Sequence, residues 1–138
     1  MPQPLVTMVL GLGVTLLVAG PLWARKPRPK PTTIDPSYVS ALAVTNRFLH
    51  AWQSGDLEAG MVLISDRARH SLNPEAFEDF FSSQATRGFE ITRGAGGRGR
   101  YRFPVVLVTT RGKQVQRKYS QITITDAGKN DWVIDKLP

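Results

Sequence analysis

YRFPVVLVT, at residues 101–109, is the stretch that decides the fold. Large side chains occupy every second position, so Tyr101, Phe103, Val105 and Leu107 would share one face of a β-strand. The same period of two recurs at residues 89–91, 114–125 and 132–134. The C-terminal half of the chain therefore predicts about four antiparallel strands joined by turns.

The strand predicted over residues 114–125 contains a change of parity. Val115 and Tyr119 would share one face of this strand, whereas Ile122 and Ile124 would share the other. Because alternation cannot change faces without an extra residue, the pattern predicts a β-bulge between Arg117 and Gln121.

The residues before these strands carry helical signals. Asp35 followed by proline is typical of a helix start, and Gly55 would end that helix. Asp56 can cap a second helix, which Ser65 could divide, and an Asn-Pro pair at 73–74 begins a third. We therefore predict an α+β fold, with three helices packed on one side of a curved antiparallel sheet of about four strands.

The N-terminal segment LVTMVLGLGVTLLVAGPLWA, residues 5–24, contains no charged residue. As a helix it would span about 30 Å, so we predict a single-pass transmembrane helix, or uncleaved signal anchor, after a tip of residues 1–4. A cleaved signal peptide is the alternative, and the chain would then be secreted. Residues 25–36 would form a proline-rich basic linker, and residues 37–138 the folded domain. The residues expected at the membrane surface are Trp23, Arg25, Lys26, Arg28 and Lys30.

The composition excludes several kinds of site. The hydrophobic content of 41% is ordinary for a globular protein, and the absence of cysteine excludes disulfides, thiolate zinc sites and iron–sulfur clusters. His50 and His70 are isolated from each other in the sequence, so we expect no metal site. No glycine-rich nucleotide-binding motif precedes a predicted helix, and we expect no cofactor.

The net charge of +7 is unevenly distributed. Residues 35–86 hold seven acidic and three basic side chains, whereas residues 87–138 hold eleven basic and four acidic ones. The basic character is therefore local to parts of the chain. The four basic residues after the apolar segment favour a cytoplasmic position of the folded domain.

Four short segments carry a resemblance to a known fold: FLHAWQSGD at 48–56, Phe80-Phe81, YRFPVV at 101–106 and WVID at 132–135. With the order of the predicted elements, they resemble the nuclear-transport-factor-2-like superfamily, which includes ketosteroid isomerase and polyketide-cyclase-like proteins. The resemblance covers about residues 36–138. It implies a cone in which helices and the concave sheet face enclose a pocket, catalytic in some members and a binding or assembly surface in many. It also favours an extracytoplasmic domain, so the side of the membrane stays undetermined.

Aromatic residues are the candidates for lining such a pocket, and each of them also suits a plain hydrophobic core. These residues are Tyr38, Trp52, Tyr101, Phe103, Tyr119 and Trp132. The favoured function is that of a membrane-tethered, non-catalytic domain that binds a small apolar ligand or a protein partner. Homodimerisation through the outer sheet face is a further expectation, because Pro104, Val106 and Val108 make that face apolar.

An isomerase- or cyclase-type enzyme is the alternative, with Tyr38 as a hydrogen-bond donor to a developing oxyanion. Such an enzyme needs a carboxylate inside the pocket. The sequence pattern places no carboxylate there: Asp135, for example, has the parity opposite to Trp132 and Ile134. We therefore assign no catalytic residue.

Arginine and glycine make up most of residues 93–102, between two predicted strands. The arginines there are Arg93, Arg98, Arg100 and Arg102. A flexible loop whose charges keep a sheet edge soluble explains this pattern. The alternative is a site for an anionic partner, namely anionic lipid or an acidic protein. Nucleic acid is less expected, because arginine- and glycine-rich RNA-binding segments are longer and repeated.

Overall fold

The computed structural model describes residues 34–82 and 85–138. These residues form four helices and five strands, so the predicted count of three helices and about four strands was wrong. The predicted fold also began with a membrane-spanning helix, and within the described residues no helix is long and apolar enough for that role. The segment at 5–24 lies outside the described residues, as do the tip at 1–4 and the linker up to residue 33. The same is true of the predicted membrane-surface residues Trp23, Arg25, Lys26, Arg28 and Lys30.

Helix α1 (Pro36–Ser54) begins and ends at the residues that the sequence indicates. The side chain of Asp35 accepts a hydrogen bond from the backbone N–H of Ser37 at 3.0 Å and so caps the first turn. Gly55 ends the helix in the left-handed conformation, with a φ of 73° that glycine adopts without a steric penalty.

The second predicted helix is divided at Ser65, as the sequence allowed, into α2 (Leu57–Met61) and α3 (Asp66–Ser71). Ser65 separates them because its hydroxyl accepts a hydrogen bond from a backbone N–H in the first turn of α3. Its own backbone N–H donates to the carbonyl of Ile134 at 2.8 Å, so this stretch is bound to the sheet and cannot stay helical. Helix α4 (Pro74–Ser82) completes the helical half.

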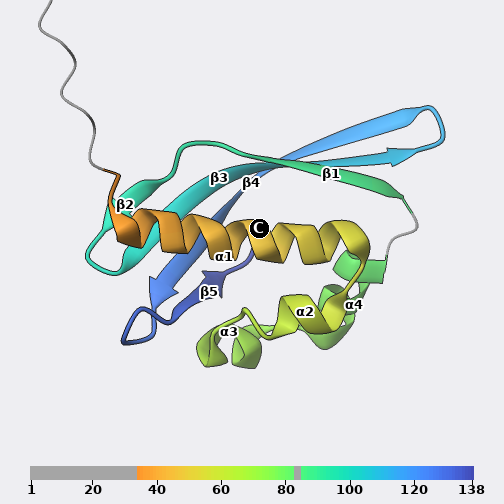
Figure 1. The fold of residues 1–138 in the computed structure, drawn as a ribbon. Helices are drawn as coiled ribbons and strands as arrows, with labels where there is room; N and C mark the ends of the chain where they lie inside the picture. Colours follow the sequence, from red (N-terminus) through yellow and green to blue (C-terminus); the bar gives the residue numbers. More distant parts are fainter. Residues whose placement is uncertain (1–33, 83–84) are drawn as a thin grey trace, which may run out of the picture. The chain divides into compact units, whose positions relative to one another are not determined.

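The five strands form one antiparallel sheet in the order β1-β3-β4-β5, and β2 pairs with the beginning of β3. The strands are β1 (Thr86–Ile91), β2 (Ala95–Gly97), β3 (Arg100–Arg111), β4 (Gln114–Asp126) and β5 (Trp132–Lys136). The prediction treated β2 as a loop, because an alanine and two glycines carry no hydrophobic period. Figure 1 shows α1 lying across one side of this sheet, with α2, α3 and α4 on that same side. We call this side of the sheet its inner face.

The pairing of β3 with β4 has a continuous register from Arg100↔Thr125 to Arg111↔Gln114. The bulge predicted between residues 117 and 121 is therefore absent from this ladder, and that prediction was wrong. Tyr119 lies on the outer face with 76% of its surface exposed, so the change of parity reflects an exposed tyrosine and not a change of face. The register shift of the sheet lies between β4 and β5 instead, at Thr123 and Ile124.

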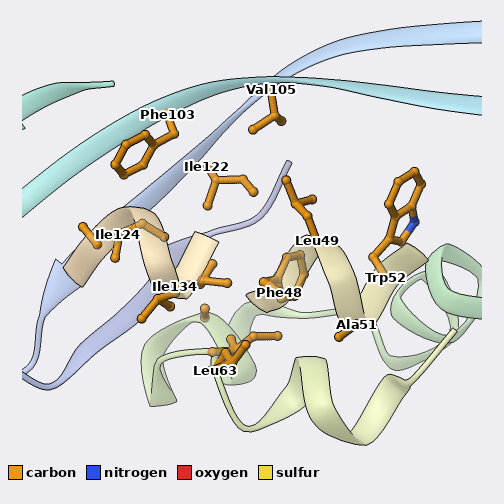
Figure 2. Close-up of a cluster of buried hydrophobic side chains, with 14 of the residues drawn as sticks. Phe48, Leu49, Ala51, Trp52, Leu63, Phe103, Val105, Ile122, Ile124 and Ile134 are labelled. Atoms are coloured by element: carbon orange, nitrogen blue, oxygen red, sulfur yellow. The ribbon is translucent and has the colours of Figure 1, made fainter. Parts of the chain in front are cut away.

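The core lies between α1 and the inner face of the sheet. In Figure 2, Phe48 and Leu49 of α1 point toward residues of β3 and β4, with Ile134 of β5 beside them. The side chains that they meet include Phe103, Val105, Ile122 and Ile124. All of these are almost fully buried, and their burial is the main source of stability for a domain without disulfides.

Candidate functional site

On β1, β3 and β4, the side chains of the inner face change from apolar to polar and cationic toward the β3–β4 turn. On β3 and its neighbours, Leu107 lies opposite Phe89 of β1 and Lys118 of β4. One step further along, Thr109 lies opposite Arg87 of β1 and Gln116 of β4. Because residues directly opposite in a register share a face, these polar side chains all lie on the face that carries the core.

A cavity of about 470 Å³ lies at this end of the sheet, which we call the hairpin-end cavity. Figure 1 shows that the β3–β4 hairpin extends beyond the C-terminal end of α1. The cavity is lined by Trp52, Asp79, Phe80, Arg87, Leu107, Thr109, Arg111, Gln116, Arg117 and Lys118. An apolar floor from α1, α4 and β3 therefore meets a polar and mainly cationic wall.

Trp52 and Phe80 form the aromatic part of the floor. Their rings stack with centroids 5.6 Å apart and an interplanar angle of 22°. The Trp52 Nε1–H donates a hydrogen bond of 3.0 Å to the carbonyl of Phe80. Because this bond fixes the indole against α4, the floor is held in place before any ligand arrives.

Arg87 joins this floor to the end of α1. Its guanidinium lies 5.3 Å from the centroid of the Trp52 ring and donates a hydrogen bond to the Trp52 carbonyl. The side-chain amide of Gln53 donates to the Arg87 carbonyl at 3.0 Å, which ties β1 to the same helix end. A cation is favourable at a helix C-terminus and over an indole face. Burial of the guanidinium nevertheless lowers the pKa of Arg87 from its ordinary value.

Of the six predicted pocket aromatics, Trp52 lines the hairpin-end cavity. Four others form a separate aromatic cluster near the start of α1. Tyr38 has its ring centroid 5.7 Å from that of Tyr101 and 5.3 Å from that of Phe103, and Trp132 is 5.7 Å from Tyr101. Tyr119 lies on the outer face of the sheet, away from both groups.

The aromatic cluster near the start of α1 is packed interior. Tyr101, Phe103 and Trp132 are buried, and the Tyr38 hydroxyl accepts a hydrogen bond of 3.1 Å from the backbone N–H of Gly94. The indole N–H of Trp132 is buried and has no hydrogen-bond partner among the described residues. None of these four residues lines the hairpin-end cavity.

The sequence interpretation missed Phe80, Arg87, Arg111 and Lys118 as cavity residues. A signal for Lys118 was present, because it shares the parity of Ile122 and Ile124 and is thus a cation in an inner-face row. The predicted bulge hides this signal, because it would place Val115 and Tyr119 on the inner face and Lys118 on the outer face. The remaining three residues become neighbours only through the folding of α4 and β1 onto the hairpin.

The predicted loop is in part a paired hairpin: Arg100 and Arg102 lie on β3 opposite β2, whereas Arg93 precedes β2. Arg93, Arg100 and Arg102 surround a hollow of about 380 Å³, which we call the outer arginine hollow. The hollow exists because Arg100 and Arg102 lie opposite Gly97 and Ala95, whose side chains are absent or small. Arg98 occupies the turn between β2 and β3 with a positive φ of 54° and does not line the hollow.

Groups for acid–base or metal chemistry are sparse in the described residues. Among the residues that line the hairpin-end cavity, Asp79 is the single carboxylate, and it is exposed. Asp135 accepts a hydrogen bond from the Ser65 hydroxyl at 3.1 Å and lies 4.0 Å from the guanidinium of Arg67. Within residues 34–82 and 85–138, no three potential ligands gather as a metal site would require.

Comparison with solved structures shows a shared fold. A SEC-C motif containing protein from Rhodopseudomonas palustris superposes with a TM-score of 0.57 at 11% identity, over 68% of this chain and 73% of that one. A SEC-C motif containing protein from Psychrobacter arcticus gives 0.57 at 12% identity, over 70% of this chain and 58% of that one. The protein RV0760c from Mycobacterium tuberculosis gives 0.51 at 16% identity, over 69% and 85%.

At these identities the comparisons establish the fold alone. A putative NTF2-like transpeptidase from Campylobacter jejuni is a weaker likeness, with a TM-score of 0.49 at 10% identity over 70% of this chain and 97% of that one. No protein-family model matches the sequence, and no curated protein matches it significantly. The architecture of helices on one side of an antiparallel sheet agrees with the nuclear-transport-factor-2-like resemblance, while membership of that superfamily stays a prediction.

Proposed function

We propose that the folded domain binds a small, largely apolar ligand in the hairpin-end cavity without transforming it. The observation that carries this proposal is the cavity itself, about 470 Å³ in volume with Trp52, Phe80 and Leu107 on its floor. Sites for small molecules in proteins have volumes of about 300–1,000 Å³ and mainly apolar walls with a few polar groups. The hairpin-end cavity has a volume within this range, and its floor is apolar while its wall is polar and mainly cationic.

The stacked pair of Trp52 and Phe80 supports binding of a flat or branched hydrocarbon body. The Trp52 indole is fixed by its hydrogen bond to the Phe80 backbone carbonyl, and the Phe80 ring stacks on it, so a ligand would have little to order. Binding without catalysis is supported by the position of Asp79, which is exposed at the edge of the cavity and accepts no described hydrogen bond that would orient it.

The experiment measures binding of N-phenyl-1-naphthylamine, an uncharged dye whose fluorescence rises when water is excluded. The wild-type domain should bind it, and Thr109→Trp should abolish binding because Thr109 lines the cavity and an indole would fill it. Thr110→Trp is the matched control, since Thr110 is the next residue of β3 and pairs with Val115 on the outer face. Equal binding by both variants, or none by the wild type, would contradict the proposal.

A second candidate function is the binding of an anionic lipid surface at the outer arginine hollow. Three arginines and no carboxylate line this hollow, together with Pro104 and Gln121. Basic groups near an anionic bilayer contribute about 1 kcal/mol each. The apolar outer face next to the hollow, including Val106 and the exposed Tyr119, suits an interfacial position.

Vesicle sedimentation at low salt tests this second function. Vesicles that contain anionic phospholipid should retain the domain, and vesicles of phosphatidylcholine alone should not. The double variant Arg100→Gln/Arg102→Gln should lose retention, while Arg47→Gln/Lys129→Gln removes the same charge elsewhere and should keep it. Retention by both kinds of vesicle would contradict recognition of anionic lipid, and stronger binding to single-stranded RNA than to vesicles would exclude a lipid surface as the partner.

A further inference from the structure

We infer that the ligand of the hairpin-end cavity is an amphipathic anion, whose acidic group lies toward Lys118 and whose apolar body rests on Trp52 and Phe80. The chemical class is a small carboxylate with an aromatic or branched aliphatic body. This inference rests on the proposed function, because it specifies the ligand of the same cavity.

The first argument is the convergence of charge on one end of the inner face. Arg87, Arg111 and Lys118 come from three different strands, and all three line the same cavity. The register brings them together: Lys118 lies opposite Leu107, and Arg87 lies opposite Thr109, the residue two positions further along β3. Elsewhere these inner-face rows consist mainly of core residues such as Phe103 and Ile122, so the cations are confined to the part that the cavity occupies.

The second argument is the imbalance of charge in the wall. Four cationic side chains line the cavity, the three named above and Arg117, against the single carboxylate of Asp79. In a concave site with an apolar floor, the electrostatic field of these cations is less screened than on an open surface. A neutral ligand would gain no net electrostatic attraction from these cations, and a cationic ligand would be repelled by them.

The third argument assigns the direct contact to Lys118. The Arg87 guanidinium already contacts the Trp52 carbonyl and ring. It therefore adds positive charge at the cavity floor but does not contact the ligand's acidic group directly. Lys118 is exposed, and its side chain has no hydrogen bond or ion pair within the described part of the chain. Its ammonium can therefore meet a carboxylate without breaking an existing contact.

The apolar floor limits the class of anion. A free inorganic anion would have nothing to place on Trp52, Phe80 and Leu107. A carboxylate attached to a hydrocarbon body satisfies both parts of the cavity, since its charged end stays near water and Lys118 while its body leaves water.

The test compares two ligands of nearly equal shape, 2-naphthoate and uncharged 2-naphthylmethanol, by isothermal titration calorimetry on the wild-type protein. We expect 2-naphthoate to bind more tightly, with a preference that shrinks as salt is added. Lys118→Gln should weaken 2-naphthoate about fivefold and leave 2-naphthylmethanol unchanged. Asp79→Asn should strengthen 2-naphthoate, because it removes the negative charge from the wall.

Lys113→Gln is the matched control, because Lys113 lies in the β3–β4 turn and does not line the cavity. It should leave the affinities for both compounds unchanged. If both compounds bind the wild type equally and neither responds to Lys118→Gln, the inference is wrong while the proposed function stands. If neither compound binds the wild type, and N-phenyl-1-naphthylamine does not bind either, both fail.

Discussion

The hydroxyl of Tyr101 donates a hydrogen bond to the carboxylate of Asp35, the residue that caps helix α1. One carboxyl group thus holds both the first turn of α1, through the Ser37 N–H, and the beginning of β3. These two hydrogen bonds lower the pKa of Asp35, and the hydrogen bond to the carboxylate raises the pKa of Tyr101. The contact therefore attaches the start of the main helix to the sheet in a way that depends on pH.

Stability should fall at both ends of the pH range because of this contact. The lowered pKa of Asp35 gives stability that is present above its unfolded-state pKa of about 3.9 and is lost as pH falls toward the folded value. The raised pKa of Tyr101 gives stability that is present below about pH 10 and is lost as pH rises beyond it. Urea unfolding of the wild type and Tyr101→Phe from pH 3 to pH 11 measures the effect. The difference between the two proteins should be largest near neutrality, and a difference that is constant with pH would contradict the assignment.

Gly96→Ala should destabilise the β2–β3 hairpin. A Cβ at Gly96 would lie 2.2 Å from the backbone oxygen of Arg100, and the φ of +146° is one that other residues rarely adopt. We expect a loss of about 1–3 kcal/mol, measured by chemical denaturation. Gly97→Ala is the control: a Cβ there meets nothing within 4 Å, so its effect should stay within about 0.5 kcal/mol. Equal losses in both variants would show that the hairpin is not packed as described.

Two strand aromatics should differ strongly in their contribution to stability. Phe103 is fully buried between α1 and the sheet, whereas Tyr119 is 76% exposed on the outer face. Phe103→Ala should lower the free energy of unfolding by about 3–5 kcal/mol. Tyr119→Ala should change it by less than about 0.5 kcal/mol, since few contacts are lost. A large loss from Tyr119→Ala in a monomeric sample would place this side chain in the interior and overturn the register of β4.

Ser65→Ala should cost about 1 kcal/mol, because the hydroxyl caps α3 and also donates to the carboxylate of Asp135. Ser71→Ala provides the comparison at the other end of the same helix. Its hydroxyl only donates to the carbonyl of Ala68 within the helix, so the loss should be smaller. Thermal unfolding followed by circular dichroism ranks the two variants. A larger loss from Ser71→Ala would be inconsistent with Ser65 as the residue that divides α2 from α3.

The local signals of the sequence were accurate where a single element decides its own boundaries. Asp35 and Gly55 bound α1 as predicted, because a cap depends on the few backbone groups next to it. The division at Ser65 and the strand β2 were incompletely predicted or missed. The division at Ser65 depends on a hydrogen bond to Ile134 in β5, which is distant along the chain. Strand β2 depends on pairing with β3 and has no large hydrophobic side chains that would reveal it.

The amino-acid order by itself determined that helices precede strands and which side of each element meets the core. Side-chain spacing of 3.6 or two residues is a property of a short window, so it can be read without knowing the neighbours. Only the tertiary structure decided where along these faces the core stops and the hairpin-end cavity begins. Trp52 and Phe103 both lie on core-facing sides, yet Trp52 reaches the cavity and Phe103 does not. The reason is that the core ends where α1 ends beneath the longer β3–β4 hairpin (Figure 1), and this is a relation between two segments and not a property of either one.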